Sequence, residues 1–163
     1  MAFTGFPHEA FAFYERLAAD NSRTFWLANK AVFEAAVRTP MVELTETLGD
    51  HGPFHIFRPN RDVRFAKDKT PYKDHMGAYS ESEGGAGYYI HLGASGILTG
   101  CGYYDMAADQ LERFRAAVDA SATGEDIAAK CAAVARQGLR LGAMSELKTA
   151  PRGYPKDHPR IEL

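Results

Sequence analysis

The residues best suited to chemistry lie in one short segment of the chain, from Arg58 to His75. It contains six lysines and arginines and three aspartates, a net charge of +3, whereas the whole chain has a net charge of −2. Guanidinium and ammonium groups are the donors that phosphate and carboxylate ligands require, and an arginine can bind two oxygens at once. Two prolines prevent a long helix here, and loops commonly hold functional groups. The sequence therefore predicts an anion-binding site in a loop.

The side chains expected to bind the ligand are cationic or aromatic. Arginines and lysines supply the charge, and a tyrosine supplies either a ring for stacking or a hydroxyl group. An arginine of the C-terminal tail is expected to close over the same place. The expected partner is an anionic small molecule, such as a phosphorylated compound or a nucleotide. The ligand-binding residues predicted in this way are Arg61, Arg64, Lys67, Lys69, Tyr72, Lys73 and Arg152.

Two alternatives use the same residues differently. An enzyme acting on a phosphorylated substrate would use Asp62 or Asp68 as general base or Mg²⁺ ligand and His158 as general acid. Arg64 would then stabilise developing negative charge. In the second alternative the protein is a structural or interaction domain, and its aspartates pair with the arginines and lysines in a charge network. Whether the protein is an enzyme stays open at this point.

Other kinds of site find no support in the sequence. The six histidines and two cysteines lack the paired spacing of zinc ligands, so no metal is expected. The chain contains neither a Walker phosphate loop nor a dinucleotide-binding glycine pattern nor a nucleophile elbow. The sequence therefore identifies no cofactor.

The bulk properties restrict the class of protein. A length of 163 residues predicts a single domain, residues 1–163. The net charge of −2 argues against general nucleic-acid binding, although a local basic patch can still contact a nucleic-acid end. No signal peptide and no apolar run of membrane-spanning length is apparent, so a cytoplasmic protein without membrane contact is expected. The oligomeric state cannot be read from the sequence.

Hydrophobic spacing predicts which elements position the charged segment. Apolar residues recur at helical spacing from Ala10 to Leu17 and from Phe25 to Ala36, with Asn21 or Ser22 as the N-cap of the second helix. The pair Thr39-Pro40 predicts a boundary or kink, and a further helical piece follows it. Helices are also predicted over residues 106–120 and from Thr123 to about residue 136.

Between these helices the spacing changes to the period of two that is typical of strands. Residues 54–57, 63–65 and 75–79 are predicted as short strands, and residues 87–92 and 97–104 as a hairpin. Tyr88, Ile90 and Leu92 are expected on one face, and Tyr89 and His91 on the other. The order of the elements predicts an α+β fold, in which a mainly antiparallel sheet packs against N-terminal and C-terminal helices.

Three motifs resemble the DUF2461 family of uncharacterised conserved proteins. Residues 61–73, RDVRFAKDKTPYK, are similar to the central family motif R-D-x-R-F-S-K-D-K-x-P-Y-K. Residues 21–26 resemble the Asn-x-Arg-x-Trp-Phe-like start of the family, and residues 151–159 its late P-x-G-Y…H-P signature. The resemblance covers essentially the whole chain and implies a fold but no activity, because the function of the family is unknown.

The chain also departs from the family pattern. Ala66 stands where serine is common, so a hydroxyl group cannot be essential at this position. Family members tend to continue past the position equivalent to Leu163, so the resemblance leaves open whether this chain lacks a closing C-terminal extension of the domain.

Overall fold

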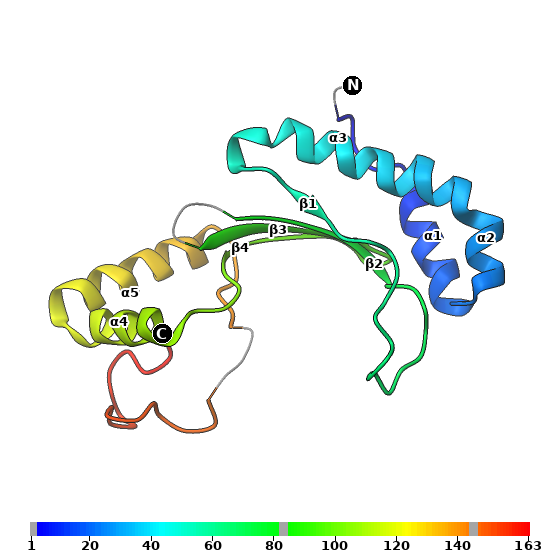
Figure 1. Ribbon diagram of the computed structural model, residues 1–163. Helices are drawn as coiled ribbons and strands as arrows, with labels where there is room; N and C mark the ends of the chain where they lie inside the picture. The colour runs from blue at the N-terminus through cyan, green and yellow to red at the C-terminus, as the bar shows by residue number, and fades with distance from the viewer. Residues whose placement is uncertain (1–2, 82–84, 144–146) are drawn as a thin grey trace. The chain divides into compact units, whose positions relative to one another are not determined.

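The computed structural model describes residues 3–81, 85–143 and 147–163. The chain divides into two compact units, Met1–Tyr103 and Tyr104–Leu163. The first unit contains the N-terminal helices and the strands, and the second contains two helices and the C-terminal tail (Figure 1).

The first unit begins with a series of helices: α1 (His8–Ala19), α2 (Arg23–Val32), the π-helical η1 (Phe33–Arg38), α3 (Thr39–Thr47) and the short 3₁₀ turn η2 (Gly49–His51). Ser22 is the N-cap of α2, and its hydroxyl oxygen accepts the Phe25 N–H at 3.1 Å. The helix widens into the π-helical η1 after α2, and Pro40 follows in the first turn of α3. Proline lacks an N–H and crowds the carbonyl four residues earlier, so a π-helical turn before it is a suitable adjustment.

The strands form one antiparallel sheet in the order β1 (His55–Ile56), β2 (His75–Glu81), β3 (Ala86–Gly93) and β4 (Gly96–Tyr103). This arrangement confirms the predicted α+β fold with an antiparallel sheet. The strand predicted over residues 63–65 is wrong. The backbone N–H groups of Arg64 and Thr70 donate to the side chains of Asp62 and Asp68, two residues earlier in each case. Such local bonds form turns in place of a strand ladder.

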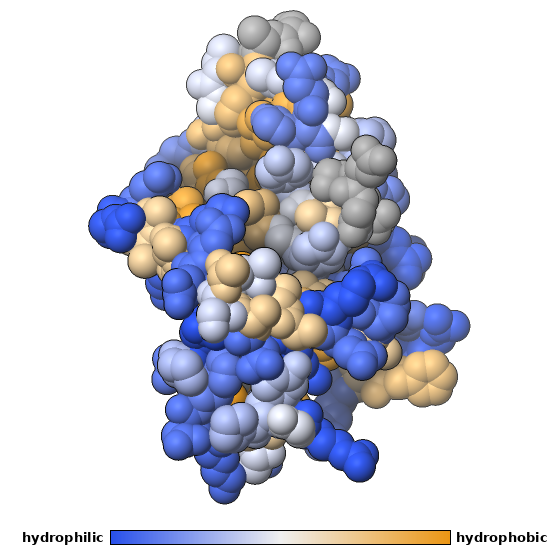
Figure 2. Space-filling model, turned by 90° about the vertical axis from the view of Figure 1, so that its left-hand side faces the viewer, coloured by the Kyte–Doolittle hydropathy of each residue, from blue (hydrophilic) through white to orange (hydrophobic). Residues whose placement is uncertain are grey.

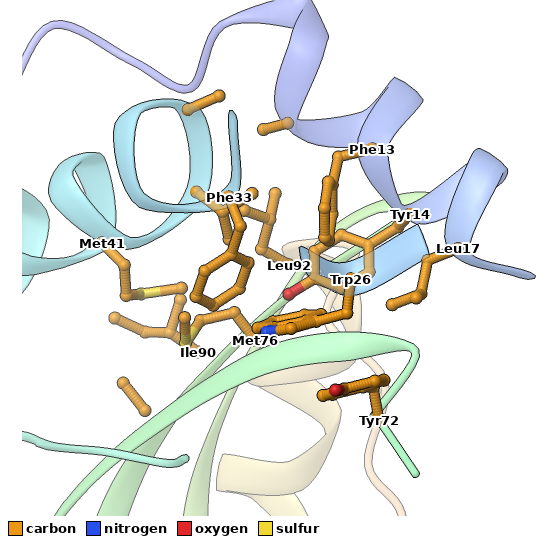
Figure 3. Packing of buried hydrophobic residues seen from close by; sticks show 14 residues of the cluster. Phe13, Tyr14, Leu17, Trp26, Phe33, Met41, Tyr72, Met76, Ile90 and Leu92 are labelled. Carbon is orange, nitrogen blue, oxygen red and sulfur yellow. The ribbon is translucent and has the colours of Figure 1, made fainter. Parts of the chain in front are cut away.

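The core of the first unit lies between the helices and one face of the sheet (Figure 3). The helices contribute mainly aromatic side chains, and β2 and β3 contribute aliphatic ones. The buried cluster includes Phe13, Tyr14, Leu17, Trp26, Phe33, Met41, Met76, Ala78, Ile90 and Leu92. Alternate residues of β2 and β3 therefore face this core, and the residues between them lie on the opposite face of the sheet.

The second unit contains α4 (Ala108–Asp119), α5 (Ser121–Arg136) and an irregular tail. The helix predicted from Thr123 begins two residues earlier, because the Thr123 hydroxyl donates to the Ala117 carbonyl at 2.5 Å and caps no helix start. The Arg160 side chain donates to the Val118 carbonyl at 2.7 Å and to the Asp119 carbonyl at 2.8 Å. The tail is thereby held against the last turn of α4.

On the face seen in Figure 2, hydrophilic side chains alternate with smaller hydrophobic areas. Within the described ranges, no helix combines the length and the apolar character that crossing a membrane requires.

Candidate functional site

The charged segment forms the loop between β1 and β2, and its base is closed by backbone hydrogen bonds. The Arg61 N–H donates to the Pro71 carbonyl and the Lys73 N–H to the Pro59 carbonyl, each at 2.8 Å. Tyr72 lies between these bonds and is 7% exposed. Its ring stacks on Trp26 with a centroid separation of 4.2 Å and an angle of 9°. One predicted ligand contact, Tyr72, thus packs in the core and anchors the loop.

Arg61 and Asp68 form an ion pair inside the loop, and Arg61 also donates to the Thr70 hydroxyl. Asp68 further accepts the Thr70 N–H at 2.9 Å and the Thr70 hydroxyl at 3.0 Å. The hydrogen bond from the Thr70 backbone, followed by that from Arg61, lowers the pKa of Asp68 to about 2. These contacts make Asp68 an acceptor for the donors of its own loop.

Arg64 and Asp62 form a second ion pair of the same kind. The carboxylate accepts from Nε at 2.9 Å, from Nη2 at 2.6 Å and from the Arg64 backbone at 3.2 Å. These hydrogen bonds hold the pKa of Asp62 below its usual range. Lys69 donates to the carbonyls of Val63 at 2.9 Å and Arg64 at 3.4 Å. Much of the positive charge in the loop therefore satisfies groups of the loop itself.

Lys73, Arg58 and Lys67 behave differently from these paired cations. Within the described ranges, the Lys67 and Arg58 side chains have neither a hydrogen bond nor an ion pair. The Lys73 ammonium lies 4.9 Å from the centroid of the Phe57 ring, a cation–π contact. Partial burial and the neighbouring Arg58 charge lower the pKa of Lys73. The structure thus brings Lys73 near Arg58, whose charge also acts on the Asp62 carboxylate.

The face of the sheet opposite the core carries a group of polar and aromatic side chains next to Lys73. The pairing of β2 with β3 places Tyr79 opposite Tyr89 and Gly77 opposite His91. Phe57 follows β1, and its ring stacks on Tyr79 at 5.4 Å. We call this group the sheet-face cluster: Phe57, Lys73, Asp74, His75, Tyr79, Tyr89 and His91.

Gly77 of β2 and Gly93 of β3 have no side chain, and this leaves room for the rings of the cluster. A Cβ atom on Gly77 would lie 2.8 Å from the Phe57 ring and 3.2 Å from the Tyr89 hydroxyl. A Cβ atom on Gly93 would lie 3.1 Å from Nε2 of His91. Glycine within a strand commonly marks such a close approach. The rings of the sheet-face cluster therefore lie across the backbone of β2 and β3.

A line of polar contacts crosses the sheet-face cluster. Asp74 Oδ1 lies 2.7 Å from His75 Nδ1, and this hydrogen bond lowers the pKa of Asp74. The His75 and His91 rings are stacked, with centroids 4.1 Å apart at 18°. Nδ1 of His91 lies 3.3 Å from the Tyr89 hydroxyl. Burial, and then the neighbouring His75, lower the pKa of His91.

The sequence interpretation did not identify the sheet-face cluster. It placed Tyr89 and His91 on one face of their strand and predicted a strand that begins at His75. Both predictions are needed to locate the cluster. The missing fact was the register of β2 against β3, which pairs Gly77 with His91 and His75 with Gly93.

The predicted tail residues belong to the second unit. His158 is largely buried; its Nε2 lies 3.2 Å from Asp119, and its Nδ1 accepts the Arg160 N–H at 3.1 Å. Arg152 lines an open groove of about 500 Å³ together with Arg115 and Tyr154. The closing of this tail over the charged loop stays a prediction.

No group of three or more metal-ligating side chains is present in the part of the chain that the structure describes. Residues 9–163 match the family model described as "Conserved hypothetical protein (DUF2461)". No curated protein and no solved structure matches the chain at a significant level.

Proposed function

The chain belongs to the DUF2461 family, and we propose that it binds a phosphorylated or nucleotide-like anion where the charged loop meets the sheet-face cluster. The Lys73 ammonium is held over Phe57 beside Arg58 and has no ion-pair partner among the residues that the structure describes, and this observation carries the proposal. Lys73 is partly removed from water, and the neighbouring charge of the exposed Arg58 repels its ammonium. An oxyanion placed between them would relieve this repulsion and accept charge-assisted hydrogen bonds.

The other predicted ligand residues have a secondary part in this proposal. Arg61 contacts Asp68 and Thr70 through Nη1, so its Nε and Nη2 hydrogens can still serve an anion. Lys67 adds an exposed positive charge on the same loop. Arg64 and Lys69 chiefly keep the loop in shape through their contacts with Asp62 and the backbone.

The stacked rings of Phe57 and Tyr79 support the nucleotide-like class of ligand. Tyr79 is 36% exposed, so part of its ring is open to a planar group. Aromatic side chains beside cations are a common means of holding a base next to its phosphate.

A structural role is the alternative with a specific observation in its favour, because Arg61, Asp68 and Thr70 already satisfy one another. In that case Arg61→Ala would lower the melting temperature by several degrees, and the protein would bind no anion. Acid–base catalysis by Asp62 or Asp68 has less support, since hydrogen bonds within the loop occupy both carboxylates.

Calorimetric titration with inorganic phosphate and a nucleoside monophosphate tests the proposal. Lys73→Met keeps the aliphatic stem on Phe57 but removes the charge, and Arg58→Gln removes the second charge. Each should weaken binding about tenfold or more, as expected for a charge-assisted hydrogen bond. Arg38→Gln is the matched control, because it removes one positive charge from an exposed pair with Glu34. Unchanged affinity in both loop variants would refute the proposal.

A further inference from the structure

The imidazoles of His75 and His91 have their Nδ1 atoms occupied and their Nε2 atoms available. His75 Nδ1 faces the Asp74 carboxylate, and His91 Nδ1 faces the Tyr89 hydroxyl. A carboxylate only accepts hydrogen bonds, so Nδ1 of His75 carries the proton, and its Nε2 becomes a donor when the ring is protonated. Within the described ranges, neither Nε2 atom has a hydrogen-bond partner.

The charged and titratable groups on and beside this face of the sheet come from several elements. Strand β1 contributes His55, strand β3 contributes Tyr89, and the loop after β1 contributes Arg58, Lys73 and Asp74. Tyr14 of α1 lies in the core on the other side of the sheet, and its pKa is raised by burial and then by the charge of Asp74. On this face β4 carries Leu98 and Gly100, which do not titrate. Asp62, on which the Arg58 charge also acts, is already paired with Arg64. With that ion pair counted as neutral, Arg58 and Lys73 outnumber Asp74 by a single charge.

We propose that His75 and His91 are part of the same anion site and that the pair takes up one proton when a dianionic oxyanion binds. This inference rests on the proposed function, to which it adds two binding residues and the charge of the ligand. One imidazolium raises the local charge to two, which matches a dianion such as a phosphate monoester or sulfate. Protonation of His75, whose Nδ1 already donates to Asp74, also turns its Nε2 into a donor.

The environment of His91 disfavours its protonated form while no anion is bound. Burial and the neighbouring His75 lower the pKa of His91, because a second positive charge in this place is unfavourable. A bound dianion reverses this balance and raises the pKa of the ring that takes up the proton. Binding then strengthens as the pH falls towards that pKa and weakens as the pH rises above it.

Sulfate is the suitable probe, because it keeps both charges over the range in which histidine titrates. Calorimetry at about pH 6 and about pH 8, each in two buffers of different ionisation enthalpy, measures the affinity and the protons taken up. We expect about one proton per sulfate and an affinity that falls roughly tenfold for each unit by which the pH rises above the histidine pKa. Perchlorate, a monoanion, should compete poorly at equal ionic strength.

The outcomes separate this inference from the proposed function. Absence of sulfate binding at either pH would refute both. Binding that is independent of pH and takes up no proton would refute the histidine pair and leave the anion site intact. The double variant of His75→Asn and His91→Asn should abolish proton uptake, whereas His8→Asn, on the exposed surface of α1, should not change it. If the double variant fails to fold, NMR titration of the wild-type histidine ring protons decides, because sulfate must raise the pKa of His75 or His91.

Discussion

The side-chain amide of Asn21 makes both of its hydrogen bonds to the backbone of Tyr72, 51 residues further along the chain. Its Nδ2 donates to the Tyr72 carbonyl at 3.0 Å, and its Oδ1 accepts the Tyr72 N–H at 3.1 Å. Trp26, which stacks on the Tyr72 ring, follows five residues after Asn21. Two of the motifs that resemble DUF2461 therefore meet at the base of the charged loop, where the N-terminal helices fix its position.

Replacing Asn21 by alanine should lower stability, because it leaves both backbone groups of Tyr72 without these partners. We expect a loss of about 1–3 kcal/mol in the free energy of unfolding, the usual cost of an unsatisfied buried polar group. Urea unfolding followed by tryptophan fluorescence measures the loss, since Trp26 is the single tryptophan of the chain.

Asn21→Asp serves as the graded control for this prediction. Its carboxylate keeps the acceptor for the Tyr72 N–H and loses the donor, so its stability should fall between wild type and Asn21→Ala. Equal stability of wild type and Asn21→Ala would show that water replaces the amide at no cost.

Gly77→Ala tests the packing of the sheet-face cluster. The new methyl group would lie 2.8 Å from the Phe57 ring, which must move, and Lys73 moves with it. Overpacking of this kind costs about 1–3 kcal/mol, and we also expect weaker anion binding. Gly100→Ala is the matched control, because the added methyl group has no neighbour within 4 Å. A Gly77→Ala protein as stable as Gly100→Ala would contradict this account.

The sequence predicted the fold better than it predicted the site, for a physical reason. Helices and hairpins follow from local spacing, so α1, α2 and the hairpin of β3 and β4 were expected from their own residues. The partners of the charged residues depend on loop conformation. Residues 63–65 form no strand, because the backbone N–H groups of Arg64 and Thr70 donate to nearby aspartates and form turns instead.

The stacking of His75 on His91 could not be predicted from the sequence for a related reason. The two residues come from different strands, and a shift of one residue in register would separate them. Tyr72 was expected at the ligand, because a tyrosine next to lysines suggests recognition. Its burial against Trp26 depends on how α2 packs, which the residues of the loop do not encode.

The pH dependence of Asp68 tests the contacts inside the loop. Its folded pKa of about 2 lies below the ordinary aspartate value of 3.8, so its contribution to stability is complete above the unfolded pKa. That contribution is lost as the pH falls from about 4 to about 2. NMR titration of the side-chain carboxyl carbon should give the pKa directly.

Arg61→Ala should raise the pKa of Asp68 only in part, because the Thr70 backbone N–H, the larger cause, remains. Arg64→Ala is the control, since Arg64 pairs with Asp62. A wild-type Asp68 that titrates near 3.8 would show that the loop does not hold these hydrogen bonds in solution.

In the second unit, Gly124→Ala tests how the tail is held. Gly124 lies within α5, where alanine normally favours the helix by up to about 1 kcal/mol. Here the added methyl group would collide with the Val118 carbonyl and would lie 2.5 Å from Nε of Arg160. We expect destabilisation instead, together with faster proteolysis of the tail, because Arg160 would lose its bonds to the end of α4.

Two further variants separate loss of the Arg160 contacts from a general effect of the added methyl group. Gly142→Ala, which meets no atom within 4 Å, should leave stability and proteolysis unchanged. Arg160→Ala should expose the tail as Gly124→Ala does, because it removes the same two hydrogen bonds to α4. The double variant should then be no more sensitive to protease than Arg160→Ala alone, since both changes act on one contact. Additive effects would mean that Gly124 and Arg160 act independently, which the geometry of this turn argues against.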